Sequence, residues 1–199
     1  LLALLELASQ QGVKKVFIHA ILDGRDMSFD SGKSLLEELI SATKELKVGQ
    51  IATVSGRFWA MDRDNRWQRT EKAYRAMTFG EAAIQTQNIL KTIDEQYNSE
   101  VYDEEMPPIV VVDKNQKPLT KIQNGDSIIF FNFRADRARQ LTKAFILPGF
   151  DRFNRGEYLH DLEFVTMTQY EKNLPVAVAF PPEFIDEPLA KILSDKGLK

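Results

Sequence analysis

The sequence of 199 residues contains no cysteine and only two histidines, His19 and His160. The lack of cysteine excludes disulfides and thiolate metal sites, and two histidines are too few for a histidine-rich metal centre. No apolar run approaches the roughly 20 residues that a membrane-spanning helix needs, so we expect a cytoplasmic protein. The net charge of −3 argues against general nucleic-acid binding.

Apolar residues make up 43% of the chain, which is enough for a sizeable core. Near-continuous apolar runs at 13–22, 50–55 and 127–133 are typical of buried strands, and amphipathic stretches separate them. Helices are expected at 1–11, 32–47, 65–77, 80–97 and 135–147. This alternation predicts an α/β fold, namely a mostly parallel sheet with helices on both faces, and leaves open an added β-hairpin within 108–133.

Pro181 and Pro182 mark the best candidate for a domain boundary, because two prolines interrupt both helices and strands. We expect one domain over 1–182 and the start of another over 183–199. The chain opens inside a helical pattern at Leu1 and closes in another helix, so we interpret it as a piece of a longer protein.

Two cationic segments stand out in this acidic chain. Residues 57–75 contain six basic and three acidic residues, and residues 134–143 contain four basic residues and one acidic residue. Eight of these ten basic residues are arginine, whose planar guanidinium can bind a carboxylate or phosphate through two hydrogen bonds. The pattern indicates a small anionic ligand.

Three of the expected strands lead directly into arginines. The candidate ligand-binding residues at these strand ends are Arg25, Asp26, Arg57, Arg63, Arg134 and Arg137. In an open parallel sheet, ligands bind beyond the carboxyl ends of the strands, so parallel strands would bring these side chains to one edge. Arg134 and Arg137 also flank the start of an expected helix, where free backbone N–H groups favour an anion.

Less specific interpretations apply to several of these residues. Nearby aspartates can neutralise the arginines in ordinary ion pairs. Arg66, Arg69 and Arg75 have helical spacing and are expected on a solvated face. His19 lies in an apolar strand and is interpreted as a hydrogen-bonded core histidine, whereas His160 has no evident role.

Longer motifs carry a resemblance to a known family. DGRD at 23–26, SGRFWAMDRDNRWQR at 55–69, EKAY at 71–74, NGDSIIFFNF at 124–133, NFRADRAR at 132–139 and FVTMTQY at 164–170 occur in order over nearly the whole chain. In this respect the sequence resembles the cofactor-independent phosphoglycerate mutases, which belong to the alkaline phosphatase superfamily.

The resemblance implies an enzyme of two domains that interconverts 3-phosphoglycerate and 2-phosphoglycerate through a phosphoserine. We also expect the protein to be a monomer. One domain would hold two manganese ions and the nucleophilic serine, and the inserted domain would bind the substrate. This chain would correspond to the inserted domain plus the first helix of the returning phosphatase-like domain, so its 199 residues alone are expected to be inactive and to lack the manganese ligands.

By motif, Arg25, Asp26, Arg57, Arg63, Arg134 and Arg137 are the substrate-binding positions that the resemblance implies. Asp26 is the catalytic candidate that would move the proton of the 2-hydroxyl. After DGRD, however, this chain reads MSFDSG where the family usually has a proline-containing turn. The shape of that loop is therefore left open.

Three alternatives remain at the level of sequence. The chain could belong to another metal-dependent phosphomutase such as a phosphopentomutase, act as an RNA- or anion-binding module without catalysis, or be a structural domain with solvated arginines. The first does not account for SGRFWAMDRDNRW, and the second conflicts with the net acidity, so we expect neither nucleic-acid nor membrane partners.

Overall fold

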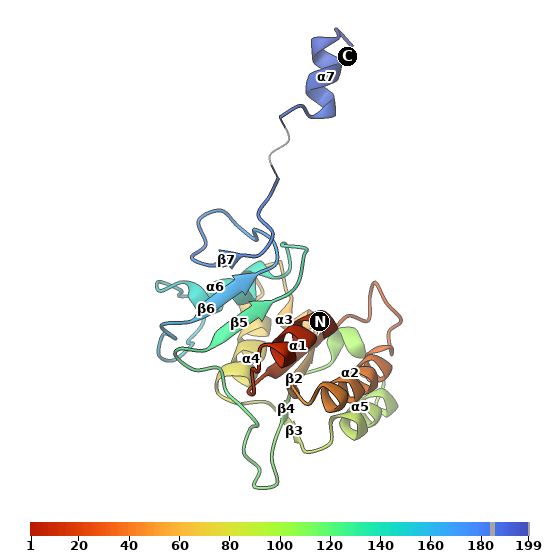
Figure 1. Cartoon of the computed structure of the whole chain (residues 1–199). Coiled ribbons are helices and arrows are strands. Elements are labelled where there is room, and N and C mark those ends of the chain that lie inside the picture. Colours follow the sequence, from red (N-terminus) through yellow and green to blue (C-terminus); the bar gives the residue numbers. More distant parts are fainter. Residues whose placement is uncertain (184–185, 199) are drawn as a thin grey trace.

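The computed structural model describes residues 1–183 and 186–198, and its strands form two sheets (Figure 1). The first sheet has the order β1-β2-β4-β3 and is made of β1 (Phe17–Leu22), β2 (Gln50–Gly56), β4 (Ile109–Val111) and β3 (Ile84–Thr86). The second has the order β5-β6-β7 and is made of β5 (Ser127–Phe130), β6 (Glu163–Thr166) and β7 (Ala177–Val178). Among these described strands, every pairing is parallel except that of β2 with β4. The predicted α/β class with mostly parallel strands is confirmed, but the strands belong to two sheets.

The first core lies between the first sheet and three helices. These are α1 (Leu2–Gln10), α2 (Gly32–Leu46) and α5 (Ile89–Asn98). Leu36 and Leu39 of α2 are three residues apart and so lie on one face of the helix, which packs against buried sheet residues such as Val54. Ile93 of α5, which is fully buried, extends the same cluster.

The second core lies around α4 (Trp67–Thr78), a helix that packs against residues of both sheets. The other elements here are α3 (Arg57–Ala60) and α6 (Arg139–Ile146). On one side of α4, Ala76 packs against Val110 of β4. On the other side, Tyr74 joins a cluster with Leu141 and Phe145 of α6, which also includes buried residues of the second sheet. Helix α4 therefore joins the two sheets, and helices cover both faces of the first sheet as expected.

The structure corrects the bounds of two expected helices and limits the hairpin that was left open within 108–133. Residues 80–88 are not helical, because β3 pairs with β4 before α5 begins at Ile89. Strands β4 and β5 belong to different sheets, so the hairpin geometry within 108–133 is limited to an antiparallel bridge between Val112 and Pro118. Helix α6 starts at Arg139 rather than at residue 135, which leaves Arg134 and Arg137 in the loop before it.

The described residues that follow Phe180 contribute nothing to either core. Helix α7 (Leu189–Asp195) has no buried residue. None of the described helices is long and apolar enough to cross a membrane.

Candidate anion-binding site

The parallel pairing of β1 and β2 brings two of the predicted segments together. Leu22, the last residue of β1, lies opposite Gly56, the last residue of β2. The loop that carries Arg25 and Asp26 therefore begins beside Arg57, the first residue of α3.

A first cluster of charged side chains forms at these strand ends. We define it as Asp23, Arg25, Asp26, Arg57 and Glu104. Nη1 of Arg57 donates to Oδ2 of Asp26 at 2.9 Å and also to Oδ1 of Asp23. Nη1 of Arg25 donates to Oε1 of Glu104 at 3.3 Å. With two arginines and three carboxylates, the first cluster has a formal charge of −1.

The position of the first cluster is fixed by a short 3-10 helix, η1 (Asp103–Glu105), that crosses both strand ends. A Cβ on Gly56 would lie 2.2 Å from the carbonyl oxygen of Glu104, and a Cβ on Gly24 would lie 2.5 Å from the nitrogen of Glu104. Only glycine allows so close an approach of two backbones. The fully buried Asp103 adds a hydrogen bond of 2.6 Å from the backbone N–H of Gly32, where α2 begins.

A second cluster comes from the loop before α4 and the loop between β5 and α6. We define it as Arg63, Arg134, Asp136 and Arg137. Oδ2 of Asp136 accepts hydrogen bonds from Nη1 of Arg63 at 2.7 Å and from Nη2 of Arg134 at 3.1 Å. Nη1 of Arg137 donates to the carbonyl oxygen of Met61 at 3.0 Å. With three arginines and one carboxylate, the second cluster has a formal charge of +2.

The loop that carries Arg63 is held by a buried network. Oδ1 of Asp62 accepts hydrogen bonds from the backbone N–H groups of Asp64 at 3.0 Å and Arg66 at 2.9 Å. Gln140 of α6 donates to the same oxygen at 3.0 Å, and its own Oε1 accepts from the backbone N–H of Asn65 at 2.7 Å. Since Asp62 and Gln140 are both buried, this network ties the Arg63 loop to the helix that follows Arg137.

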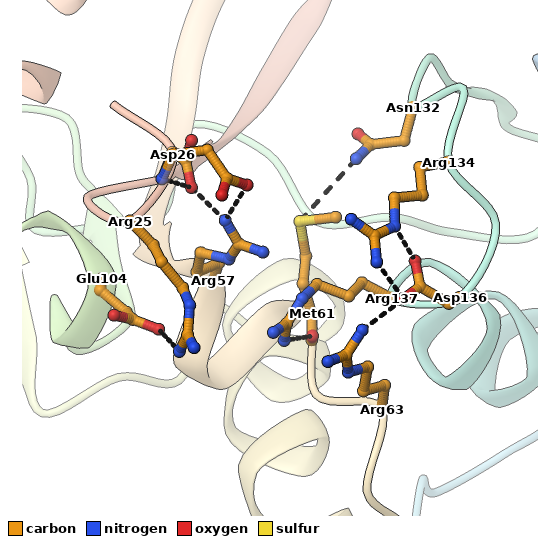
Figure 2. A network of polar contacts seen from close by, with 11 residues as sticks. Arg25, Asp26, Arg57, Met61, Arg63, Glu104, Asn132, Arg134, Asp136 and Arg137 are labelled. Atoms are coloured by element: carbon orange, nitrogen blue, oxygen red, sulfur yellow. Dashed lines mark hydrogen bonds and ion pairs between the residues drawn. The ribbon is translucent and has the colours of Figure 1, made fainter. Parts of the chain in front are cut away.

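The two clusters face one another (Figure 2). Burial lowers the pKa of the Arg137 guanidinium, and the positive charges of Arg57 and Arg63 lower it further. Arg137 is therefore close enough to a residue of each cluster to feel its charge. The structure thus brings all six predicted residues into one region. Strand β5 reaches that region from the second sheet, so the convergence does not depend on a single parallel sheet as expected.

Residues 1–172 match the family model described as the N-terminus of the BPG-independent PGAM, which is more than half of the chain. The chain belongs to this family.

Individual relatives agree with that assignment. The 2,3-bisphosphoglycerate-independent phosphoglycerate mutase of Thermomicrobium roseum is 49% identical over 100% of this chain and 38% of its own length. That of Methanococcoides burtonii is 45% identical over 99% of this chain and 38% of its own length. A crystal structure of the Leishmania mexicana phosphoglycerate mutase at low cobalt concentration matches 98% of this chain and 37% of that chain, with a TM-score of 0.87 and 29% identity. The chain therefore spans less than two fifths of the length of these family members.

The family match includes both clusters, and their electrostatics differ. A hydrogen bond from Arg57, together with its positive charge, holds the pKa of Asp26 below its ordinary value. Burial disfavours the charged guanidinium of Arg57, but the hydrogen bonds to Asp26 and Asp23 outweigh that effect and raise its pKa. Both groups are therefore charged near neutral pH.

In the second cluster, burial works against the charge of Asp136, but hydrogen bonds from Arg63 and Arg134 outweigh it and lower the pKa of this carboxyl group. Among the residues that the structure describes, no carboxylate lies within ion-pair distance of Arg137. Its Nε is buried without a hydrogen-bond partner. This arrangement can bind an anion without first breaking an ion pair of Arg137.

The expectation of solvated arginines was wrong for Arg69, but it holds for Arg66, whose side chain is 50% exposed. Arg69 lies 3.6 Å from Asp62, and its guanidinium stacks 3.5 Å from the ring centroid of Phe58. Arg75 is hydrogen-bonded to Glu81, and Arg66 forms a longer ion pair with Asp64.

The two histidines lie outside both clusters. Nδ1 of His19 is hydrogen-bonded to Oγ1 of Thr53 at 2.8 Å, and burial lowers the pKa of His19 to about 4. This agrees with its interpretation as a neutral, hydrogen-bonded histidine of the core. His160 contacts Asp161 and Asn124 on the surface.

Sequence reasoning missed Glu104 and the Asp62–Gln140 network. Glu104 is 79 positions from Arg25, and Gln140 is 78 positions from Asp62, so no local spacing connects these partners. In the sequence, Asp136 was considered only as one of several aspartates that could neutralise the nearby arginines. The Arg-Ala-Asp spacing is short enough for an ion pair, and that signal could have singled it out.

Within residues 1–183 and 186–198, no group of three or more histidine, cysteine, aspartate or glutamate side chains could hold a metal ion.

Proposed function

We propose that this chain is the substrate-binding part of an isomerase that interconverts 3-phosphoglycerate and 2-phosphoglycerate in glycolysis and gluconeogenesis. The observation that carries the proposal is the pair of facing clusters at the family-motif positions, one with a charge of −1 and one with a charge of +2. Phosphoglycerate carries a carboxylate and a phosphate on a three-carbon chain. Arginines are suited to both groups, because a guanidinium can donate two parallel hydrogen bonds to either.

The proposed binding residues are Arg25, Asp26, Arg57, Arg63, Arg134 and Arg137. Asp26 is the proposed catalytic residue. As the phosphoryl group returns to the 2-hydroxyl oxygen, Asp26 would accept the proton of that hydroxyl. The hydrogen bond that Asp26 accepts from Arg57 supports this role. If Arg57 donated that hydrogen bond to the substrate instead, the pKa of Asp26 would rise when a base is needed.

We further propose that the complete protein contains a second, phosphatase-like domain, which begins within 183–199 and follows a substrate-binding domain over 1–182. The lack of buried residues in α7 supports a boundary near Pro181 and Pro182. The nucleophilic serine and the ligands of two manganese ions would belong to that second domain, in a cytoplasmic monomer. No step of the chemistry assigned to the present residues passes through a metal.

The proposal is tested with the complete protein and with the 199-residue chain side by side. The complete protein should convert 3-phosphoglycerate to 2-phosphoglycerate, and mass spectrometry of a quenched reaction should find one phosphoserine. The 199-residue chain should show neither, because covalent catalysis needs a positioned nucleophile that binding residues cannot replace. Turnover by the 199-residue chain, with its mass confirmed, would contradict the proposed division of roles.

A further inference from the structure

Asp136 occupies a central position in the second cluster. Its Oδ2 atom is shared by two guanidinium groups, at 2.7 Å from Nη1 of Arg63 and 3.1 Å from Nη2 of Arg134. Its side chain is 29% exposed, although its Oδ1 atom is buried. Because of these two hydrogen bonds, Arg63 and Arg134 both contact a carboxylate of the protein itself when no ligand is bound.

The contact between Asp136 and Arg134 is not an ideal forked pair. Oδ1 of Asp136 lies 2.8 Å from Nε of Arg134, yet this oxygen has no aligned hydrogen bond. The two residues are only two positions apart, and the side chain of Arg134 is 72% exposed. A ligand that can align with the guanidinium can therefore replace Asp136 at modest cost.

The neighbouring Arg137 makes the same region attractive to anions. The charges of Arg57, Arg63 and Arg25 all disfavour the charge on Arg137, and Asp136 is the carboxylate that opposes them. Without the charge of Asp136, the second cluster would hold three arginines and no acid. Any small anion would then bind there more tightly, whether or not it is a substrate.

We propose that Asp136 is an internal counter-ion that competes with the bound anion for Arg63 and Arg134 and so limits the affinity of the site. This inference rests on the proposed function. Asp136 positions the two guanidinium groups while the site is empty, and an incoming carboxylate or phosphate takes its place. The competition weakens the retention both of product and of inorganic anions.

The decisive variant is Asp136→Asn in the complete protein, with inorganic sulfate as the probe. The inhibition constant for sulfate should fall about tenfold at low ionic strength, because one opposing charge is removed beside the bound anion. The KM for 3-phosphoglycerate should also fall, and kcat should not rise. A residue with only a structural role would not increase affinity when it is removed.

Two further variants separate charge from shape. Asp136→Glu keeps the charge, and its inhibition constant for sulfate should stay within about twofold of the wild-type value. Asp151→Asn makes the same charge change at an exposed aspartate that pairs with Arg152, and it should leave sulfate inhibition unchanged. If Asp136→Asn does not fold, Asp136→Ser removes the charge without placing an amide NH₂ against the guanidinium groups.

An unchanged or raised inhibition constant for sulfate in a natively folded Asp136→Asn or Asp136→Ser protein would overturn the inference. Direct calorimetric titration with sulfate gives the same test without turnover. A wild-type protein that binds sulfate but does not convert 3-phosphoglycerate would contradict the proposed function, and the effect of Asp136→Asn on sulfate affinity would still decide the role of Asp136.

Discussion

The two clusters that face each other are built differently. In the first, Arg57 is nearly buried, with 10% of its side chain exposed, and two carboxylates hold its guanidinium in place. In the second, Arg134 is 72% exposed and shares one carboxylate with Arg63. The first cluster has its acids in excess and the second its arginines. The comparison shows that ion pairs within the first cluster order its side chains, whereas the second cluster has an excess of positive charge that is available to a ligand.

The backbone contributes to the same difference. Helix η1 lies against the first cluster so closely that Gly24 and Gly56 cannot carry a side chain. The second cluster depends instead on the hydrogen bonds that the Asp62 carboxylate accepts from the backbone N–H of Arg66 and from Gln140. We therefore expect substitutions in the first cluster to affect stability and catalysis as well as binding, and those in the second to affect mainly affinity.

The largest effect is expected from Asp26→Asn, which neutralises the first cluster without a change of shape. The mutase rate of the complete protein should fall by roughly 10²–10⁴, the usual contribution of a positioned acid or base. Formation of the phosphoserine should fall less, because that step takes no proton from the 2-hydroxyl. Rapid-quench measurement of both steps is the test, and equal losses would make Asp26 a positioning residue.

Gly56→Ala tests whether η1 orders the first cluster. The added Cβ would lie within 2.4 Å of two carbonyl oxygens, those of Asp103 and Glu104, so η1 must shift. We expect the free energy of unfolding to fall by about 1–3 kcal/mol, as in other overpacked sites. Urea denaturation measures this change. Gly149→Ala is the matched control, because a Cβ there meets no atom within 4 Å, and a similar loss in both variants would contradict the role of η1.

Arg57→Lys preserves the charge of the first cluster but removes the planar fork. A charge-assisted hydrogen bond contributes roughly 1.5–3 kcal/mol, so binding of 3-phosphoglycerate to the complete protein should weaken about tenfold or more. Calorimetric titration measures the loss. Arg69 is unsuitable as the control because it contacts Asp62 and Phe58.

Arg152→Lys provides a better control, since Arg152 is 61% exposed and pairs only with its sequence neighbour Asp151 among the described residues. It should leave binding unchanged. Equal effects of Arg57→Lys and Arg152→Lys would mean that the arginines act as general surface charge.

The smallest effect concerns His19, in the strand that ends at the first cluster. Its pKa of about 4 in the folded chain lies below the ordinary value of 6.5, so the unfolded chain binds the proton more readily. Stability should therefore decrease as the pH falls from about 6.5 to about 4. His19→Asn should reduce this dependence, which urea unfolding at several pH values can measure. An identical pH dependence in the variant would exclude His19 as its source.

Several features could be predicted from the sequence because they depend on local patterns. Apolar runs of the right length identified β1, β2 and β5, and apolar spacing identified α2 and α4. Arginines at the ends of β1 and β2 were expected to meet, and the parallel pairing of these strands places them side by side. Their roles in substrate binding stay predictions.

Other features depended on partners that are distant in the chain. Residues 80–88 were expected to be helical, but the edge of β4 pairs with three of them as β3. Arg69 was expected to be solvated, but Asp62 and Phe58 cover it. Local propensity is a weak preference, and tertiary pairing overrides it when buried backbone groups need hydrogen bonds.

The sequence alone therefore determined the α/β class, the family motifs and the arginine-rich character of the site, since each follows from residue type and short-range spacing. Only the tertiary structure decided that the strands form two sheets, and that Glu104 and Asp136 share the arginines. It also divided the site into halves of unlike charge. Ion pairs form between side chains that packing brings together, and the partners Arg25 and Glu104, or Arg63 and Asp136, lie more than 70 positions apart in the chain.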